Sequence, residues 1–147
     1  MRQDHRDPGR RHGPDAGYTL TEMLVVIAII GLIAAVLTPS LMGQLGRARV
    51  KSAQLQLESV AAAVEMFQSD VGRYPTAGEG LKVLIDEPAD VEGWTGPYVK
   101  SASVLKDPWT GQIQYRAIDD GAFEVVSLGS DRKAGGSGTK RDLVAPK

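Results

Sequence analysis

Few side chains in this sequence are suited to chemistry, and their distribution argues against an enzyme. Cysteine is absent, and both histidines, His5 and His12, lie before Gly17. A chain beginning after Gly17 therefore lacks thiolate nucleophiles, His general bases and His-containing triads. Asp119 and Asp120 are more simply part of a turn than an acid–base pair. No catalytic residue is predicted.

Glu22 is the one charged side chain between Asp15 and Arg47. An uninterrupted apolar run, residues 23–37, follows it. With residues 18–21 in front, the segment reaches about 20 residues, the length that a membrane-spanning helix needs. A carboxylate in such a helix costs about 2.5–3.5 kcal/mol at its centre and less toward its end, so it is seldom kept without a partner. Glu22 is predicted to pair with a cation.

Three interpretations of the apolar run compete. A cleaved secretory signal peptide needs small residues around a cleavage site after the run, but Ala34 and Ala35 are followed by Val36 and Leu37. A core helix of a small domain would have a polar face, which this run lacks. The third interpretation, a membrane helix that later packs against copies of itself, is favoured, because only this one accounts for a carboxylate at position 22.

The residues before the run resemble the prepilin peptidase motif: a Gly, then an aromatic residue, then a Glu at the fifth position after the Gly. Here these are Gly17, Tyr18 and Glu22. The resemblance implies that a prepilin peptidase cleaves between Gly17 and Tyr18 and that Tyr18 becomes the N-methylated terminus. Its positive amine then pairs with Glu22 of a neighbouring subunit. Residues 1–17 are, on this interpretation, a leader peptide.

Residues 18–71 are predicted to form one long helix, membrane-spanning over about 18–38. Pro39 should kink or locally unwind it. Beyond Pro39, apolar residues recur at spacings of three and four, which predicts a helix with one face on a core. These residues are Ala53, Leu57, Val60, Ala61, Val64, Phe67 and Val71. Gly72 and Pro75 should end the helix.

Residues 72–147 are predicted to form a globular domain. A chain of 147 residues, 42% of them hydrophobic, can bury one modest core. Residues 76–85 suggest a short helix with Leu81, Leu84 and Ile85 facing inward. Residues 113–118 and 122–128 read as two strands of a hairpin. The formal net charge is -1, so no basic surface argues for nucleic acid, and binding to it is not predicted.

Several loops resemble the major pseudopilin of the type II secretion system, the general secretion pathway protein G family. The matching segments, in order, are residues 73–76 with Gly80 and Leu81, residues 94–98, residues 107–109, and residues 121–127 with Gly129 and Asp131. The resemblance implies an α+β, type IV pilin-like fold, with a long N-terminal helix packed on a small domain that holds a short helix and an antiparallel sheet.

The same resemblance implies a non-enzymatic subunit that polymerises into a periplasmic pseudopilus. Its expected partners are copies of itself, minor pseudopilins, the inner-membrane secretion platform and a prepilin peptidase. The expected location is the inner membrane, crossed once, with the C-terminal domain in the periplasm. Alternatives are a type IV pilus or competence subunit, for which a C-terminal disulfide or basic groove would be expected, and a monomeric membrane-anchored binding module.

The family implies one cofactor, calcium, in the loop after the last long strand. Asp131 and Asp142 are the candidate ligands, but Lys140 and Arg141 stand beside Asp142, whereas calcium prefers six to eight oxygens. An ion pair between Asp131 and Lys140 or Arg141 is the second interpretation, since it would tether the loop without metal. A glycine-rich mobile loop is the third.

Overall fold

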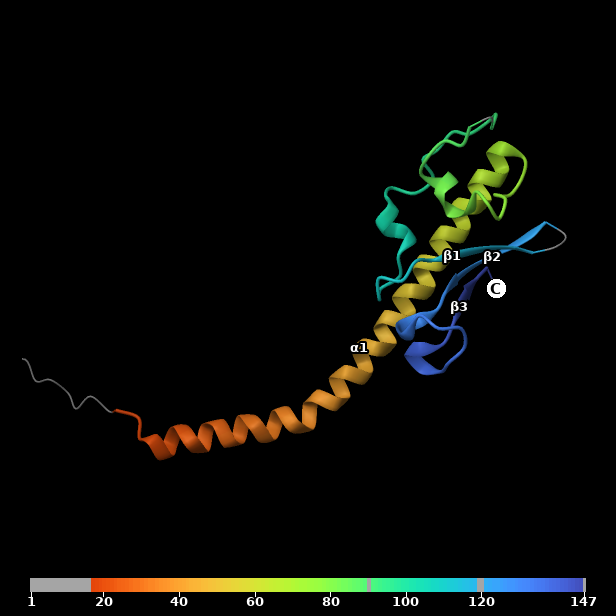
Figure 1. The fold of residues 1–147 in the computed structure, drawn as a ribbon. Coiled ribbons are helices and arrows are strands. Elements are labelled where there is room, and N and C mark those ends of the chain that lie inside the picture. Colours follow the sequence, from red (N-terminus) through yellow and green to blue (C-terminus); the bar gives the residue numbers. More distant parts are fainter. Residues whose placement is uncertain (1–16, 90, 119–120, 147) are drawn as a thin grey trace, which may run out of the picture. The chain divides into compact units, whose positions relative to one another are not determined.

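The computed structural model describes residues 17–89, 91–118 and 121–146. Residues 1–16 of the predicted leader peptide, and Asp119 and Asp120 of the predicted turn, lie outside these residues. One long helix, α1 (Leu20–Val71), is followed by short 3-10 helices and three strands (Figure 1). The chain divides into two compact units, one ending at Ser40 and one beginning at Leu41.

The first unit contains the beginning of α1, and every side chain in residues 17–40 is exposed. By length and apolar composition, α1 contains one candidate membrane span. Pro39 lies inside α1, so the local unwinding considered at this position does not occur. Because proline has no N–H, one hydrogen bond of the helix is missing at this position. In the same turn, the Thr38 hydroxyl donates a hydrogen bond to the Ala34 carbonyl oxygen, 2.6 Å away.

In the second unit, the rest of α1 supplies one side of the core. Its buried residues are Ala53, Leu57, Val60, Ala61, Ala63, Val64 and Phe67. All but Ala63 belong to the predicted stripe, whereas Val71, predicted with them, is half-buried. The helix ends as expected: Gly72 has a φ of 80°, and its N–H donates to the Gln68 carbonyl at 2.8 Å.

The short helix predicted over residues 76–85 is a 3-10 helix, Gly80–Leu84. Leu81, Val83 and Leu84 are buried in it, whereas Ile85 is half-buried. Ile85, which follows the helix, packs against the core from its half-buried position, as predicted. A second 3-10 helix, Ala102–Leu105, adds Leu105 to the core.

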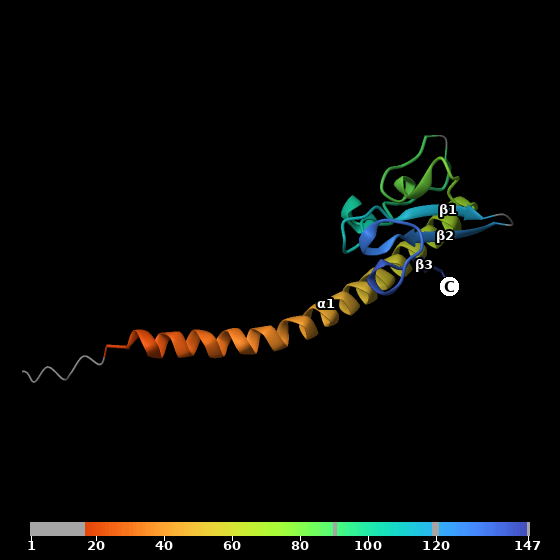
Figure 2. The same cartoon turned by 60° about the horizontal axis from the view of Figure 1, so that its bottom comes forward.

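The sheet is antiparallel with strand order β1-β2-β3. Strands β1 (Gln114–Ile118) and β2 (Ala122–Ser127) form the predicted hairpin. Strand β3 (Leu143–Ala145) pairs with β2 on its other side. The sheet lies along the second half of α1 in both views (Figures 1 and 2). The predicted α+β, pilin-like fold is confirmed, and β3 adds a strand that was not predicted.

Candidate processing and assembly site

The bond between Gly17 and Tyr18 lies outside helix α1, which begins at Leu20. The Tyr18 side chain is 76% exposed. A Cβ added at Gly17 would meet no atom within 4 Å. A non-helical, uncovered peptide is the form of backbone that a protease can bind in extended conformation. The structure therefore leaves this bond accessible for cleavage.

Glu22 lies in the first turn of α1, where a negative charge interacts favourably with the helix dipole. Its side chain is exposed, and within the described part of the chain no cation lies within ion-pair distance of it. The carboxylate therefore stands at the polar end of an apolar helix without a charged partner in these residues.

Thr19 is a residue that the sequence interpretation missed. Its hydroxyl oxygen accepts a hydrogen bond of 3.1 Å from the backbone N–H of Glu22. Thr19 and Glu22 have the spacing of a capping box, Ser or Thr followed three residues later by Glu, which was the available signal. Thr19 therefore caps the start of the helix and holds Glu22 in its first turn.

Asp131 and Asp142, the candidate calcium ligands, both hold the C-terminal loop through backbone N–H groups. Asp131 ends a short 3-10 helix, Gly129–Asp131, and its Oδ1 accepts from the Lys133 N–H at 3.2 Å. Oδ2 of Asp142 accepts from the Gly135 N–H at 3.0 Å. Oδ1 of Asp142 is buried and has no hydrogen-bond partner among the described residues.

The ion pair considered between Asp131 and Lys140 or Arg141 does not form among the described residues. The loop is held instead by close backbone approach. A Cβ at Gly129 would meet the Arg141 carbonyl oxygen at 2.7 Å, and one at Gly136 would meet the Lys140 carbonyl oxygen at 2.6 Å. Both glycines also have positive φ. The glycines therefore give this loop a defined path.

An apolar, exposed helix that continues into a domain with a small antiparallel sheet defines the class of type IV pilin-like proteins. The fold agrees with the crystal structure of the major pseudopilin from the type 2 secretion system of enterohaemorrhagic Escherichia coli. The TM-score is 0.59 at 23% sequence identity, over 73% of this chain and 94% of that chain. At this identity the likeness establishes the fold alone.

Sequence comparison establishes the family. The profile described as "Type II secretion system (T2SS), protein G" matches residues 40–146, and "Prokaryotic N-terminal methylation motif" matches residues 14–38. Type II secretion system core protein G of Xanthomonas campestris pv. campestris is 36% identical, over 94% of this chain and 93% of its own. The protein of that name from Pseudomonas aeruginosa is 35% identical, over 87% and 92%. The chain belongs to the type II secretion system protein G family.

Membership of this family makes the chain a major pseudopilin subunit, a structural component of a secretion system. The alternatives, a type IV pilus or competence subunit and a monomeric binding module, are not favoured. The methylation motif covers Gly17, Tyr18 and Glu22, so processing by a prepilin peptidase is implied, and the family implies assembly into a filament. The apolar part of α1 fits membrane anchoring.

Proposed function

We propose that this chain is cleaved between Gly17 and Tyr18, methylated on the new Tyr18 amine, and assembled through Glu22 into a periplasmic pseudopilus. The observation that carries the proposal is Glu22: one carboxylate in the first turn of an apolar helix, uncovered and without a charged partner in the described residues. The methylation motif matched over residues 14–38 supports the cleavage position.

Assembly would satisfy Glu22 through the methylated amine of a neighbouring copy. Burial in low dielectric penalises an isolated charge far more than a pair that is satisfied together. The amine of Tyr18 and the carboxylate of Glu22 lie four residues apart in sequence, and Tyr18 precedes helix α1, which begins at Leu20. A neighbour displaced along the filament axis can therefore bring one group to the other, so the charges would set subunit register.

The remaining partners and the location follow from the same proposal. The chain crosses the inner membrane once through the apolar part of α1, and its second unit lies in the periplasm. The filament is built of copies of this chain, is capped by minor pseudopilins and grows from the inner-membrane secretion platform. The protein's role is mechanical, and the chemistry of cleavage and methylation is performed on it by the prepilin peptidase.

We also propose calcium as a ligand of the C-terminal loop, held by Asp142 and Asp131. Within the described part of the chain, the buried Oδ1 of Asp142 has no hydrogen-bond partner, and an unpaired carboxylate oxygen is a group that a cation satisfies. Oδ2 of Asp142 and Oδ1 of Asp131 already accept backbone N–H groups. Calcium would supply positive charge at Asp142, and the carboxylates would fix the loop around it.

Intact mass and N-terminal sequencing test the processing step. The protein is purified from membranes of a host with its own prepilin peptidase, as wild type and as Gly17→Ala. We expect the wild-type chain to begin at methylated Tyr18 and the variant to keep its leader. Gly31→Ala is the matched control, because Gly31 is also uncrowded but lies inside α1. A wild-type chain that begins near Thr38, or at Met1 in every variant, would overturn the proposal.

A further inference from the structure

Charge is unevenly distributed along the part of helix α1 that belongs to the second unit. Residues 41–57 include basic side chains and no acidic one, whereas residues 58–71 include acidic side chains and no basic one. All of these charged side chains are exposed. They are Arg47, Arg49, Lys51, Glu58, Glu65 and Asp70. Two parallel copies level with each other would place like charges side by side, whereas a shift along the helix brings opposite charges together.

Asp70, the last acidic residue of α1, is held in one position by the loop that faces it. Its Oδ2 accepts hydrogen bonds from the hydroxyl groups of Thr95 and Tyr98, the latter at 3.0 Å. The Tyr98 ring is fixed in turn by edge-to-face contacts with Phe67 and Trp94, with centroids 5.9 and 5.8 Å apart. The Asp70 carboxylate is therefore oriented before a partner arrives, which lowers the entropic cost of binding one.

The pocket at Asp70 is complementary to a cation on an apolar stem. Its volume is about 370 Å³, and Met66 and Pro97 line it beside Asp70. The hydroxyl groups that Asp70 binds are neutral, and within residues 17–89, 91–118 and 121–146 no cation lies within ion-pair distance of its carboxylate. A lysine side chain can lay its methylene groups against the apolar rim and hold its ammonium group at the carboxylate.

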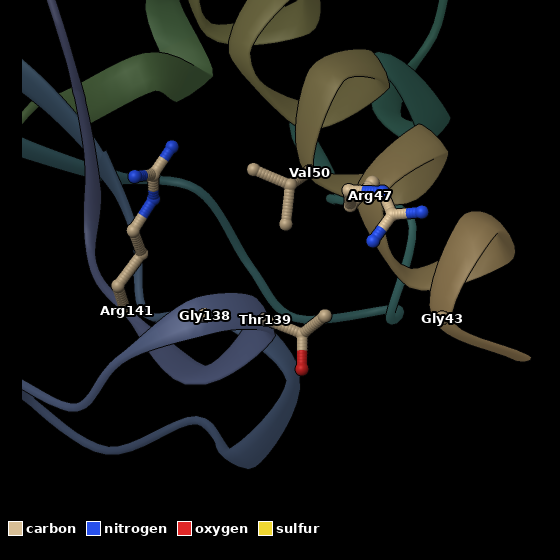
Figure 3. Close-up of a pocket in the computed structure, with 6 residues that line it drawn as sticks. All are labelled: Gly43, Arg47, Val50, Gly138, Thr139 and Arg141. Carbon is tan, nitrogen blue, oxygen red and sulfur yellow. The ribbon is translucent and has the colours of Figure 1, made fainter. Parts of the chain in front are cut away.

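Lys51 is the basic residue of α1 that another copy can reach most directly. Eighteen residues, or five whole turns, separate Arg49 from the fully buried Phe67, so both project from the core side of the helix. Arg47 lines a groove beside the C-terminal loop of its own chain (Figure 3). Nine residues, or two and a half turns, separate Lys51 from the fully buried Val60. Lys51 therefore projects from the side of α1 opposite the core.

We propose that the Asp70 pocket of one copy binds the ammonium group of Lys51 of a neighbouring copy in the filament. Nineteen residues separate the two positions on α1, about 28 Å of helix at 1.5 Å per residue. One chain cannot make this contact within itself, but a parallel neighbour shifted by that length can. The contact joins different surfaces of two copies, and such contacts can repeat without closing into a ring, as a filament requires. The inference rests on the filament assembly in the proposed function and adds to it a contact between second units.

Zero-length cross-linking of sheared wild-type filaments with a carbodiimide tests this contact, because the reagent joins an amine directly to a carboxylate. We expect mass spectrometry to find peptides linked through Lys51 and Asp70. Lys82 and Asp86, 3.9 Å apart within one chain, are the positive control for the reaction. Filaments that show the Lys82–Asp86 link but no Lys51–Asp70 link would overturn this inference and leave the proposed function standing. A processed wild type that forms no filaments would overturn the proposed assembly, and this contact with it.

Charge reversal gives a second test, with folding checked by circular dichroism. Lys51→Glu should lower filament yield at least about fivefold, because it brings like charges together at the contact. The double variant Lys51→Glu/Asp70→Lys should return the yield to within about twofold of wild type, since it restores opposite charges.

Arg49→Glu is the matched control, because it makes the same change of charge two residues away on the core side of α1. Its filament yield should stay within about twofold of wild type, as expected for a charge outside the contact. An equal loss in Arg49→Glu and Lys51→Glu would overturn the inference in favour of a general effect of charge. A folded double variant that assembles no better than Lys51→Glu would also overturn it. The wild-type cross-link needs no variant, so it decides the question even where Asp70→Lys prevents folding.

Discussion

Arg73 and Glu79 join the end of helix α1 to the turn that follows it. The Arg73 guanidinium binds both carboxylate oxygens of Glu79, each at 2.8 Å. Thr76 adds two hydrogen bonds to the same carboxylate, one from its N–H and one from its hydroxyl. Chiefly because of Arg73, the pKa of Glu79 is lowered to about 2, from an ordinary value of 4.5.

A group whose pKa is lower in the folded than in the unfolded state stabilises the fold at pH values above its unfolded-state pKa. This contribution is lost as the pH falls through its folded-state pKa. The Glu79 contribution should therefore be complete above about pH 4.5 and disappear toward pH 2. The side chains are 41% and 22% exposed, so solvent screening limits the contribution to about 1 kcal/mol.

Glu79→Gln should lower the free energy of unfolding by about 1 kcal/mol at pH 7, by loss of this screened pair. It should also flatten the pH dependence of that free energy between about 4.5 and 2. Urea unfolding of the full chain in detergent across this range measures both effects. Glu92→Gln, at an exposed position, is the control and should follow wild type. A Glu79→Gln curve parallel to wild type would contradict the linkage.

At the scale of elements, α1 holds the second unit together through Phe67, which is fully buried. Its ring meets that of Tyr98 edge to face, with centroids 5.9 Å apart. Phe67→Ala should lower the free energy of unfolding by about 3–5 kcal/mol, because it removes apolar burial and leaves a cavity. Thermal unfolding measures this loss. Met66→Ala next to it, at a 58% exposed side chain, should change stability by under about 1 kcal/mol.

The C-terminal loop is the element on which calcium is proposed to act. Calcium should raise the melting temperature of the full chain and a chelator should lower it, because the metal binds the folded loop and not the unfolded chain. Asp142→Asn should remove most of this difference. Asp86→Asn is a control acid at an exposed position outside the loop. A melting temperature that neither calcium nor chelator changes would contradict the calcium proposal.

Elements with a repeated pattern were predictable from the sequence, and elements made by distant partners were not. The stripe from Ala53 to Phe67 repeats over several turns and identified the core face of α1. Strand β3 has three residues, too few for alternation to show, and it exists through pairing with β2. Likewise, residues 107–109 could be matched to a family loop from the sequence, but the hydrogen bond that the buried Asp107 carboxylate accepts from the Ser127 hydroxyl could not be predicted.

The same distinction, between local sequence patterns and distant partners, applies to the candidate site. Gly17, Tyr18 and Glu22 could be proposed from sequence because their spacing is local. The meeting of helix α1 with the C-terminal loop could not be predicted, since Gly46 and Thr139 are far apart in the chain and come into contact only when the loop folds back onto the helix. Whether Asp142 has a partner for Oδ1 also depends on how the loop folds back.

At the scale of the whole molecule, two demands meet in helix α1: its first part must be stable in lipid, and it must later pack in a filament. An apolar helix surface is stable both in the lipid bilayer and in the core of a filament. The Glu22 carboxylate is not equally stable in both environments. At the edge of a bilayer it can be solvated by water and headgroups, whereas a filament core excludes both. On the assembly proposed for Glu22, its charge would distinguish the two states, and the partner it meets would determine which state is stable.

Glu22→Gln tests that argument, because it removes the charge and nearly preserves the volume. Cleavage after Gly17 should continue, since the peptide bond lies outside the helix. Filament yield should fall at least about tenfold, as loss of a partner from a buried pair leaves the neighbour's amine uncompensated at a cost of about 3–5 kcal/mol. Electron microscopy and cross-linking of sheared filaments measure assembly, and intact mass measures processing. Glu58→Gln, exposed on the same helix, should assemble normally. Abundant filaments from processed Glu22→Gln would show that subunit register is set by apolar packing alone.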